Sequence, residues 1–335
     1  MPMQLLHSLA EWAARFGSPP RPTVLTIGNF DGLHLGHQRI IRRVVEQARA
    51  LGALAAVVTF DPHPLKVLRP DGAPPLIASL PQRLLDLDQL GLDAALILPF
   101  DLELSRLPPA DFVQQILVEH LHARAVFVGE NFRFGHHQAG DVRLLMEIAQ
   151  ARGFTVTIIP PVICRGEIVS STAIRDTVRA GEIGRAARLL GHPFRLTGEI
   201  RPGSGTGRRA VVPTLNLAPD QELLPRSGVY ATETRLESHP GRVFRSVTNV
   251  GTRPTFDGTR LSVETYLFDF SEEIASGRMA IDFWLRLREE RKFNGPGELQ
   301  AQIRSDIARA RSFFRRLDHA RAVLRSHPRH APEPF

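Results

Sequence analysis

The first half of the chain alternates short, continuous apolar runs with longer stretches in which apolar residues recur every three or four positions. Continuous apolar runs of strand length predict strands buried on both faces, and the longer stretches predict amphipathic helices. The predicted strands are 24–27, 53–60, 94–99, 125–129 and 154–159, and the predicted helices are 38–51, 81–90, 110–122 and 142–152. This alternation indicates an α/β fold, a doubly wound parallel sheet with helices on both faces.

The pattern changes after residue 190, where Gly191 and Pro193 interrupt the last helical stretch. The runs that follow are shorter and are separated by glycine and proline: 194–200, 228–236, 243–250, 261–270 and 280–287. Such runs predict a small antiparallel β-barrel, and a helical pattern over 296–325 predicts a terminal helix whose apolar side lies on the barrel. We therefore expect two domains, 1–190 and 191–330.

Composition narrows the class of protein. A length of 335 residues exceeds one typical domain, which agrees with the two predicted ones. No apolar run is long enough to cross a bilayer, and the first residues lack the pattern of a signal peptide. The single cysteine, Cys164, excludes an internal disulfide, and the lack of a Cys/His cluster argues against structural zinc. We expect a cytoplasmic protein without a membrane segment.

The net charge of +7 raises the possibility of nucleic-acid binding. Residues 276–330 hold 13 Lys plus Arg and 6 Asp plus Glu, so this one segment accounts for the whole excess. No interleaved aromatic residues accompany these arginines, which favours a solvated helix face over a nucleic-acid groove. A nucleic-acid-binding protein remains the alternative from another functional class, and we expect no nucleic-acid partner.

Four polar motifs follow predicted strands or the last apolar run of the first domain. They are GNFDGLHLGH (28–37), TFDPHP (59–64), GENFRFG (129–135) and VSSTAIR (169–175). Ligands of open α/β sheets bind outside the carboxyl ends of the strands. The four motifs are therefore expected to converge on one ligand.

The motif GNFDGLHLGH is a candidate phosphate cradle. Its glycines Gly28, Gly32 and Gly36 would let a polyanion approach the backbone, and the helix that follows offers free N–H groups. The imidazoles of His34 and His37 could donate to phosphate oxygens. The alternative is a glycine-rich turn with two surface histidines, and the H-x-G-H spacing directly after a strand favours the phosphate site.

The next two motifs carry further polar candidates. His63, between two prolines, could point at the ligand or simply end a strand. Asn131 can both donate and accept hydrogen bonds. For Phe132 and Phe134 we favour packing on the core.

In VSSTAIR, the hydroxyl of Ser170, Ser171 or Thr172 is expected to cap the following helix. Capping needs only one hydroxyl. Three of them, with Arg175 one turn in, favour a seat for a phosphate whose charge grows during phosphoryl or nucleotidyl transfer.

In the second domain, a glycine-rich loop with Gly203 and Gly207 leads to Thr214 and Asn216. Such a loop could hold a nucleotide phosphate and a metal, although glycine and serine also make ordinary linkers. Glu264 is a possible general base for a substrate hydroxyl, and the alternative is a solvated strand carboxylate.

The four motifs together resemble those of the nucleotidyltransferase superfamily with the HxGH signature. The closest likeness is to the FMN adenylyltransferase module of bacterial bifunctional riboflavin kinase/FAD synthetases. The resemblance implies that His34 and His37 contact ATP phosphates and stabilise the transition state as the FMN phosphate attacks the α-phosphorus and pyrophosphate leaves. It implies a catalytic role for Arg175. It also implies nucleotide or flavin contacts for these motif residues: Gly28, Phe30, Asp31, Gly36, His63, Asn131, Ser171 and Thr172.

The second domain resembles riboflavin kinase. GRRAVVPTLN is similar to GRRLGFPTAN, TNVGTRPTF to NIGTRPTF, and VETYLFDF to EVHLLDF. The resemblance implies that Gly203 and Gly207 lie in the nucleotide loop, that Thr214 and Asn216 bind Mg²⁺ and ATP, and that Glu264 activates the riboflavin 5′-hydroxyl.

The sequence departs from the kinase pattern at 210–212, where Ala-Val-Val replaces Leu-Gly-Phe. We expect an enzyme that phosphorylates riboflavin to FMN and adenylylates FMN to FAD, with ATP and Mg²⁺. An FAD synthetase with a non-catalytic, flavin-binding barrel is the alternative among enzymes. The sequence does not predict the oligomeric state.

Overall fold

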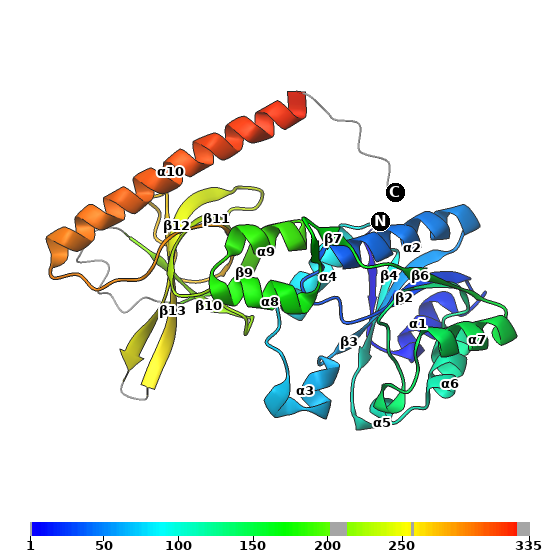
Figure 1. The fold of residues 1–335 in the computed structure, drawn as a ribbon. Helices are drawn as coiled ribbons and strands as arrows, with labels where there is room; N and C mark the ends of the chain where they lie inside the picture. Colours follow the sequence, from blue (N-terminus) through cyan, green and yellow to red (C-terminus); the bar gives the residue numbers. More distant parts are fainter. Residues whose placement is uncertain (1, 202–212, 256–257, 327–335) are drawn as a thin grey trace. The chain divides into compact units, whose positions relative to one another are not determined.

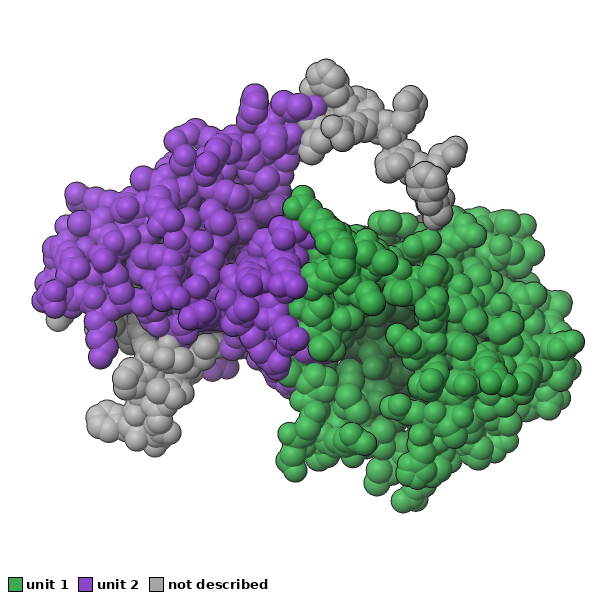
Figure 2. All heavy atoms as spheres, in the orientation of Figure 1, with its two compact units in different colours: residues 1–174, 189–191 green, residues 175–188, 192–335 purple. Residues whose placement is uncertain are grey.

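The computed structural model describes residues 2–201, 213–255 and 258–326, which fold as two compact units (Figure 2). Unit 1 comprises residues 1–174 and 189–191, and unit 2 comprises residues 175–188 and the chain from 192 onward. The domain boundary after residue 190 stays a prediction.

The described strands of unit 1 form one six-stranded sheet in the order β1-β4-β3-β2-β5-β6. All neighbouring strands pair in parallel, which confirms the predicted doubly wound sheet. The strands are β1 (Gln4–Leu6), β2 (Thr23–Ile27), β3 (Leu54–Asp61), β4 (Ala94–Pro99), β5 (Ala123–Gly129) and β6 (Thr155–Ile159).

Helices cover both faces of this sheet (Figure 1). One apolar cluster joins the sheet to α1 (Leu9–Phe16), the helix η2 (Phe112–His120) and α7 (Val142–Arg152). The other joins the opposite face to α2 (Leu35–Leu51) and α4 (Leu80–Asp88). The strands β2 to β5 are apolar on both faces and therefore need a covering layer on each side. The helices provide these layers, and the sheet is buried.

The remaining short elements of the described chain connect these layers. They are α3 (Pro64–Leu68), η1 (Pro70–Gly72), α5 (Leu102–Ser105), α6 (Pro109–Asp111), η3 (His136–Gln138) and the hairpin of β7 (Ile163–Cys164) and β8 (Glu167–Ile168). The helices α8 (Ser171–Ala180) and α9 (Ile183–Leu190) follow, and most of their residues belong to unit 2. The hydroxyl of Ser170 accepts the backbone N–H of Ala173 at 3.2 Å, which confirms that a hydroxyl of VSSTAIR caps α8.

Two features of unit 1 differ from the sequence prediction. The helix predicted over 110–122 is α6 followed by a π-helix, Phe112–His120. Its i→i+5 bonding is not distinguishable from an α-helix in a short apolar pattern. The strand β1 and helix α1 were not predicted, because a three-residue strand gives too short an apolar run and takes its place by pairing with β4.

Unit 2 contains a closed barrel in the order β10-β13-β12-β11-β14-β9, with every neighbouring pair antiparallel. This confirms the predicted barrel. The strands are β9 (Phe194–Arg201), β10 (Leu215–Pro219), β11 (Gly228–Leu236), β12 (Phe244–Thr255), β13 (Gly258–Leu267) and β14 (Arg278–Arg288). The strand β10 was not predicted, because its five residues are short, partly polar and end in proline.

Hydroxyl groups fill part of the barrel interior. Thr232 bonds to Ser246 at 2.8 Å and to Thr248 at 2.7 Å, and the chain continues from Thr248 to Thr265 at 2.9 Å and from Ser246 to Thr234 at 2.8 Å. All five side chains are fully buried. Each hydroxyl therefore has a partner, as a buried polar group requires.

The long helix α10 (Pro296–Ser326) lies on the outside of the barrel, as predicted (Figure 1). Phe314 is fully buried between the helix and the strands. Around it, arginines stack on aromatic rings: Arg245 lies 5.1 Å from the Phe314 ring centre and Arg321 lies 4.8 Å from that of Trp284. In the described part of the chain, no helix combines the length and apolar character needed to cross a bilayer.

We expect Phe314→Ala to lower the free energy of unfolding of unit 2 by about 3–5 kcal/mol, because it removes a fully buried ring and leaves a cavity under α10. The neighbouring Phe313 is only half-buried, so Phe313→Ala is the matched control and should cost roughly half as much. Denaturant unfolding followed by Trp284 fluorescence in a Trp12→Phe background measures both. Equal losses would contradict this packing of α10.

Candidate functional site

The strand β2 lies at the centre of the sheet of unit 1, hydrogen-bonded to β3 on one side and β5 on the other. The chain order reverses between β2 and β5, which makes a crevice at their carboxyl ends. The motifs after β2, β3 and β5 all lie at this edge. The fourth motif is tied to the first by a hydrogen bond from the Ser171 hydroxyl to the Asp31 carbonyl, 3.1 Å long.

The two histidines of the first motif lie against each other. The side chain of His34 is the N-cap of α2, and its Nδ1 accepts the backbone N–H of His37 at 3.3 Å. The two imidazole rings stack with their centres 3.6 Å apart. The H-x-G-H spacing therefore places both rings together at the N-terminus of a 17-residue helix, where backbone N–H groups favour anions.

The environment of His37 keeps its imidazole neutral. Burial lowers the pKa of His37 well below its usual value, and the charges of His34 and Arg83 lower this pKa further. Its Nδ1 is buried and has no hydrogen-bond partner within the described residues. At neutral pH, His37 can therefore contact a ligand as a neutral hydrogen-bonding ring and not as a cation.

Phe30 and Asp31 lie beneath this turn. Phe30 is 2% exposed and its ring meets the edge of His37 at a centre-to-centre distance of 5.2 Å. The Asp31 carboxylate accepts the backbone N–H groups of Ile77 at 2.9 Å and Ala78 at 3.1 Å. These contacts give both residues a part in shaping the turn, and direct contact with a nucleotide stays a prediction for each.

Gly28 and Gly36 keep the turn tight. A Cβ on Gly28 would lie 3.2 Å from the Phe30 ring, and one on Gly36 would lie 3.1 Å from the His34 ring. Larger residues would therefore push against the side chains that shape the cradle. The approach of a phosphate to these glycines stays a prediction.

His63, in the loop after β3, is the N-cap of α3, and its Nδ1 accepts the backbone N–H of Leu65 at 3.2 Å. Its Nε2 lies 3.1 Å from the side-chain amide of Asn29, in the loop after β2. The two loops are thus joined through their side chains, and a contact of His63 with the ligand stays a prediction.

A buried arginine joins the loop after β2 to the end of β3 through their backbone. Arg83 on α4 is 5% exposed, and its guanidinium donates to the carbonyl of Asn29 at 2.6 Å and to the carbonyl of Phe60 at 3.2 Å. Burial lowers the pKa of Arg83, while the nearby carboxylates of Asp31 and Asp61 raise it in part.

Arg83 was not predicted from the sequence, because on its own it is one polar position of an amphipathic helix. Asn29 was not predicted either, although this residue lies inside the first motif. Both gain their significance from contacts with residues that are distant in the sequence.

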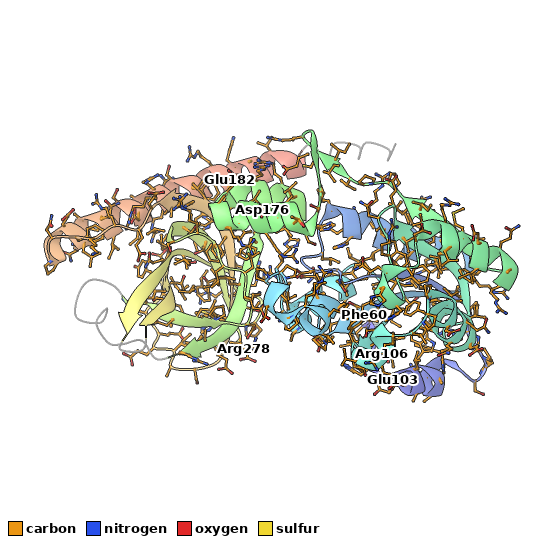
Figure 3. The ribbon with its side chains drawn as sticks, turned by 60° about the horizontal axis from the view of Figure 1, so that its bottom comes forward. Phe60, Glu103, Arg106, Asp176, Glu182 and Arg278 are labelled. Carbon is orange, nitrogen blue, oxygen red and sulfur yellow. The ribbon has the colours of Figure 1, made fainter. Side chains whose placement is uncertain are left out.

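A cavity of about 900 Å³ opens beside this turn within unit 1. The motif residues Gly28, Asn29, His63 and Asn131 line it. Its walls are aromatic, with Phe60, Phe100, Phe112, Phe132 and Phe134. Figure 3 labels Phe60 of this wall, and it labels Glu103 and Arg106 in and next to α5.

The charged residues that line the cavity are basic. They are Arg69 and Arg133, joined by the histidines His136 and His137, and no carboxylate is among the described lining residues. A flat aromatic ligand that carries a phosphate suits this combination. Phe134 is also part of the buried core and Phe132 packs against that core, which confirms their predicted packing.

The last motif lies at the start of α8. Ser171 and Thr172 are its first two residues, directly after the capping Ser170. Arg175 follows one turn later and is 7% exposed. Arg175 belongs to unit 2, so its catalytic contact with the ligand of unit 1 stays a prediction.

The barrel brings the predicted kinase residues onto one face. Glu264 on β13 pairs directly with Asn216 on β10 and with Asn249 on β12. Directly paired residues of antiparallel strands point to the same side of the sheet. The Ser262 hydroxyl donates to the Glu264 carboxylate at 2.7 Å. The sequence analysis did not single out Asn249, and only the strand register places it beside Glu264.

The other predicted residues of this site flank β10. Thr214 immediately precedes the strand, two positions before Asn216. Gly203 and Gly207 lie outside the described residues, as do 210–212, where the sequence departs from the kinase pattern.

Comparison with known proteins agrees with the arrangement of both units. The FAD synthetase family model matches residues 17–173, and the riboflavin kinase family model matches residues 190–314. A solved structure titled as a macrolide-efflux protein from Streptococcus pneumoniae superposes with a TM-score of 0.81 at 26% identity, covering 93% of this chain and 99% of that one. The efflux function in that title is stated for the Streptococcus pneumoniae protein and is not transferred to this chain.

Two curated relatives carry the name bifunctional riboflavin kinase/FMN adenylyltransferase. The protein from Escherichia coli (strain K12) is 34% identical over 311 residues, which is 92% of this chain and 96% of its own. The protein from Pseudomonas fluorescens is 36% identical over 293 residues, 87% of this chain and 93% of its own. The chain therefore belongs to the bifunctional riboflavin kinase/FMN adenylyltransferase family.

Proposed function

We propose that this chain makes both flavin cofactors: the barrel domain phosphorylates riboflavin to FMN with ATP, and the parallel-sheet domain transfers AMP from a second ATP to FMN to give FAD. The observation that carries the proposal is the presence, in one chain, of both parts of the machinery. The stacked histidines lie at the N-terminus of α2, and Glu264 lies between two asparagines on the barrel. We assign the first activity to residues 191–330 and the second to residues 1–190.

For adenylyl transfer, the reaction needs positioning and charge stabilisation and no protein nucleophile. An FMN phosphate oxygen attacks the α-phosphorus of ATP, and the bond to pyrophosphate breaks. Negative charge builds on the phosphate oxygens that would lie against His34, His37 and the first N–H groups of α2. The aromatic cavity beside them offers the place for the isoalloxazine ring, with Asn131 among its polar lining.

For riboflavin phosphorylation, Glu264 accepts the proton of the 5′-hydroxyl while that oxygen attacks the γ-phosphorus of ATP. The hydroxyl of Ser262 donates to this carboxylate, and Asn216 and Asn249 pair with Glu264 on the neighbouring strands.

The residues of this face also fit Mg²⁺, which would neutralise phosphate charge. Thr214 and Asn216 offer oxygen ligands. In the part of the chain that is described, no three His, Cys, Asp or Glu side chains form a metal cluster. Magnesium characteristically takes few protein ligands and completes its shell with substrate phosphates and water.

The direct test is to incubate the purified chain with riboflavin, ATP and Mg²⁺, to resolve the flavins by chromatography, and to repeat the assay from FMN. We expect FMN and then FAD from riboflavin, FAD from FMN, and no turnover after chelation of the metal. FAD from FMN without FMN from riboflavin would leave only an FAD synthetase with a flavin-binding barrel. No flavin product from either substrate would refute the proposal as a whole.

We expect His34→Ala to lower the rate of FAD formation from FMN by roughly a hundredfold or more, because it removes a donor to the developing phosphate charge. Formation of FMN from riboflavin should be unchanged. Since His34 also caps α2, His34→Asn is the matched variant: asparagine is a good N-cap but does not present the imidazole Nε2. Activity retained in His34→Asn would reduce the role of His34 to capping.

We expect Glu264→Gln to lower the rate of FMN formation by roughly a hundredfold or more, since the amide cannot take the proton of the hydroxyl. FAD formation from FMN should stay at the level of the unsubstituted chain. Glu199→Gln on β9 is the control, because it replaces an exposed strand carboxylate of the same barrel. Unchanged phosphorylation by Glu264→Gln would remove Glu264 from the role of base.

A further inference from the structure

The hydrogen bonds of His63 determine which of its ring nitrogens carries the proton. Nδ1 accepts the backbone N–H of Leu65 at 3.2 Å, so Nδ1 carries none. A neutral imidazole has one N–H group, which is therefore on Nε2. His63 presents a donor on the side that faces Asn29.

This donor fixes the orientation of the Asn29 carboxamide. Nε2 lies 3.1 Å from the side-chain amide, with Nδ2 on the near side. In that orientation two N–H donors would face each other. A flip of the carboxamide, which leaves its shape unchanged, brings Oδ1 to His63 and satisfies both groups. The NH₂ group of Asn29 then points away from His63.

The backbone of Asn29 is held as firmly as its side chain. Its carbonyl accepts from the buried guanidinium of Arg83 at 2.6 Å. Among the described residues, no side-chain hydrogen bond of Asn29 is found other than the one to His63. A donor held at both ends loses little freedom when a ligand binds.

The cavity beside Asn29 suits an anion. Asn29 and His63 both line it, the charged side chains that share the lining are Arg69 and Arg133, and no described carboxylate faces it. The neighbouring residues of the first motif lead directly to the helix N-terminus at His34. A phosphate oxygen is the ligand atom that fits a fixed N–H donor in these surroundings.

We propose that Asn29 binds substrate phosphate at the adenylyl-transfer site: its NH₂ group, oriented by His63, donates to a phosphate oxygen of FMN or ATP. His63 is a positioning residue that acts on the substrate through Asn29. This inference rests on the proposed FMN adenylyltransferase activity and adds a residue that discriminates for the charged group of its substrates.

Asn29→Asp tests the orientation directly. Aspartate keeps the shape and still accepts from His63, but it puts an anionic oxygen where the NH₂ group faced the cavity. We expect the KM of FAD formation to rise by roughly a hundredfold for the substrate whose phosphate Asn29 contacts, because like charges are brought together. Asn29→Ala only removes the donor and should raise the same KM by roughly tenfold. Separate titrations of FMN and ATP identify that substrate.

The opposite orientation of the Asn29 carboxamide predicts the opposite order of the KM values of the two variants. If the carboxamide oxygen already faced the cavity, Asn29→Asp would be no worse than Asn29→Ala, and this result would overturn the proposal. Unchanged KM values for both substrates in both variants would overturn it as well. Riboflavin phosphorylation by the same preparations serves as the internal control. FAD formation by the unsubstituted chain tests the underlying activity separately.

The positioning role of His63 is tested by a double-mutant cycle. If His63 acts through Asn29, His63→Ala raises the KM in the unsubstituted chain but adds little in an Asn29→Ala background. Additive effects would assign His63 its own contact with the substrate and overturn its positioning role. Thermal unfolding of each variant measures any loss of the α3 cap independently of the KM.

Discussion

The central position of β2 in the parallel sheet is the constraint on which the site of unit 1 depends. Because β2 is hydrogen-bonded to β3 and β5, the turn that leaves it must pass between the loops that follow those strands. The turn is then held from below by the Asp31 carboxylate and from the side by Arg83. The stacked histidines at its end are therefore presented on a rigid edge, as transition-state stabilisation requires.

The carboxylates of unit 1 lie away from the cavity, since no Asp or Glu is among the described residues that line it. The carboxylate of Asp31 and the guanidinium of Arg83 are both buried under the turn, where each forms hydrogen bonds with backbone groups of other segments. Burying such ions costs several kcal/mol each unless hydrogen bonds compensate. Here these hydrogen bonds join the turn after β2 to the segment at Ile77 and to the end of β3, and the charge of Arg83 also helps to keep His37 neutral. The buried charges of Asp31 and Arg83 thus stabilise the turn after β2 and do not compete with a phosphate ligand.

The sequence predicted the repetitive parts of the fold and the local parts of the site. Strands β2 to β6 are mainly apolar and were predicted to within two residues at either end, whereas β1 and β10 are short and exist through pairing with distant strands. The histidines His34 and His37 share one helical turn, so their spacing predicted their approach. The Asn29–His63 contact spans 34 positions and the Arg83–Asn29 contact spans 54. No local pattern encodes them, because they arise from the order of strands in the sheet.

In the barrel, the register of the strands decides whether Glu264 can act at all. A shift of one residue between β12 and β13 would turn Glu264 into the interior and Thr265 outward. The buried hydroxyl chain opposes that shift, since the hydrogen bond between Thr248 and Thr265 forms only when the two side chains face each other inside. In the same register Asn249 and Asn216 flank Glu264 on the outside. The polar interior of the barrel therefore does more than fill space: it selects the one strand pairing that assembles the proposed kinase residues.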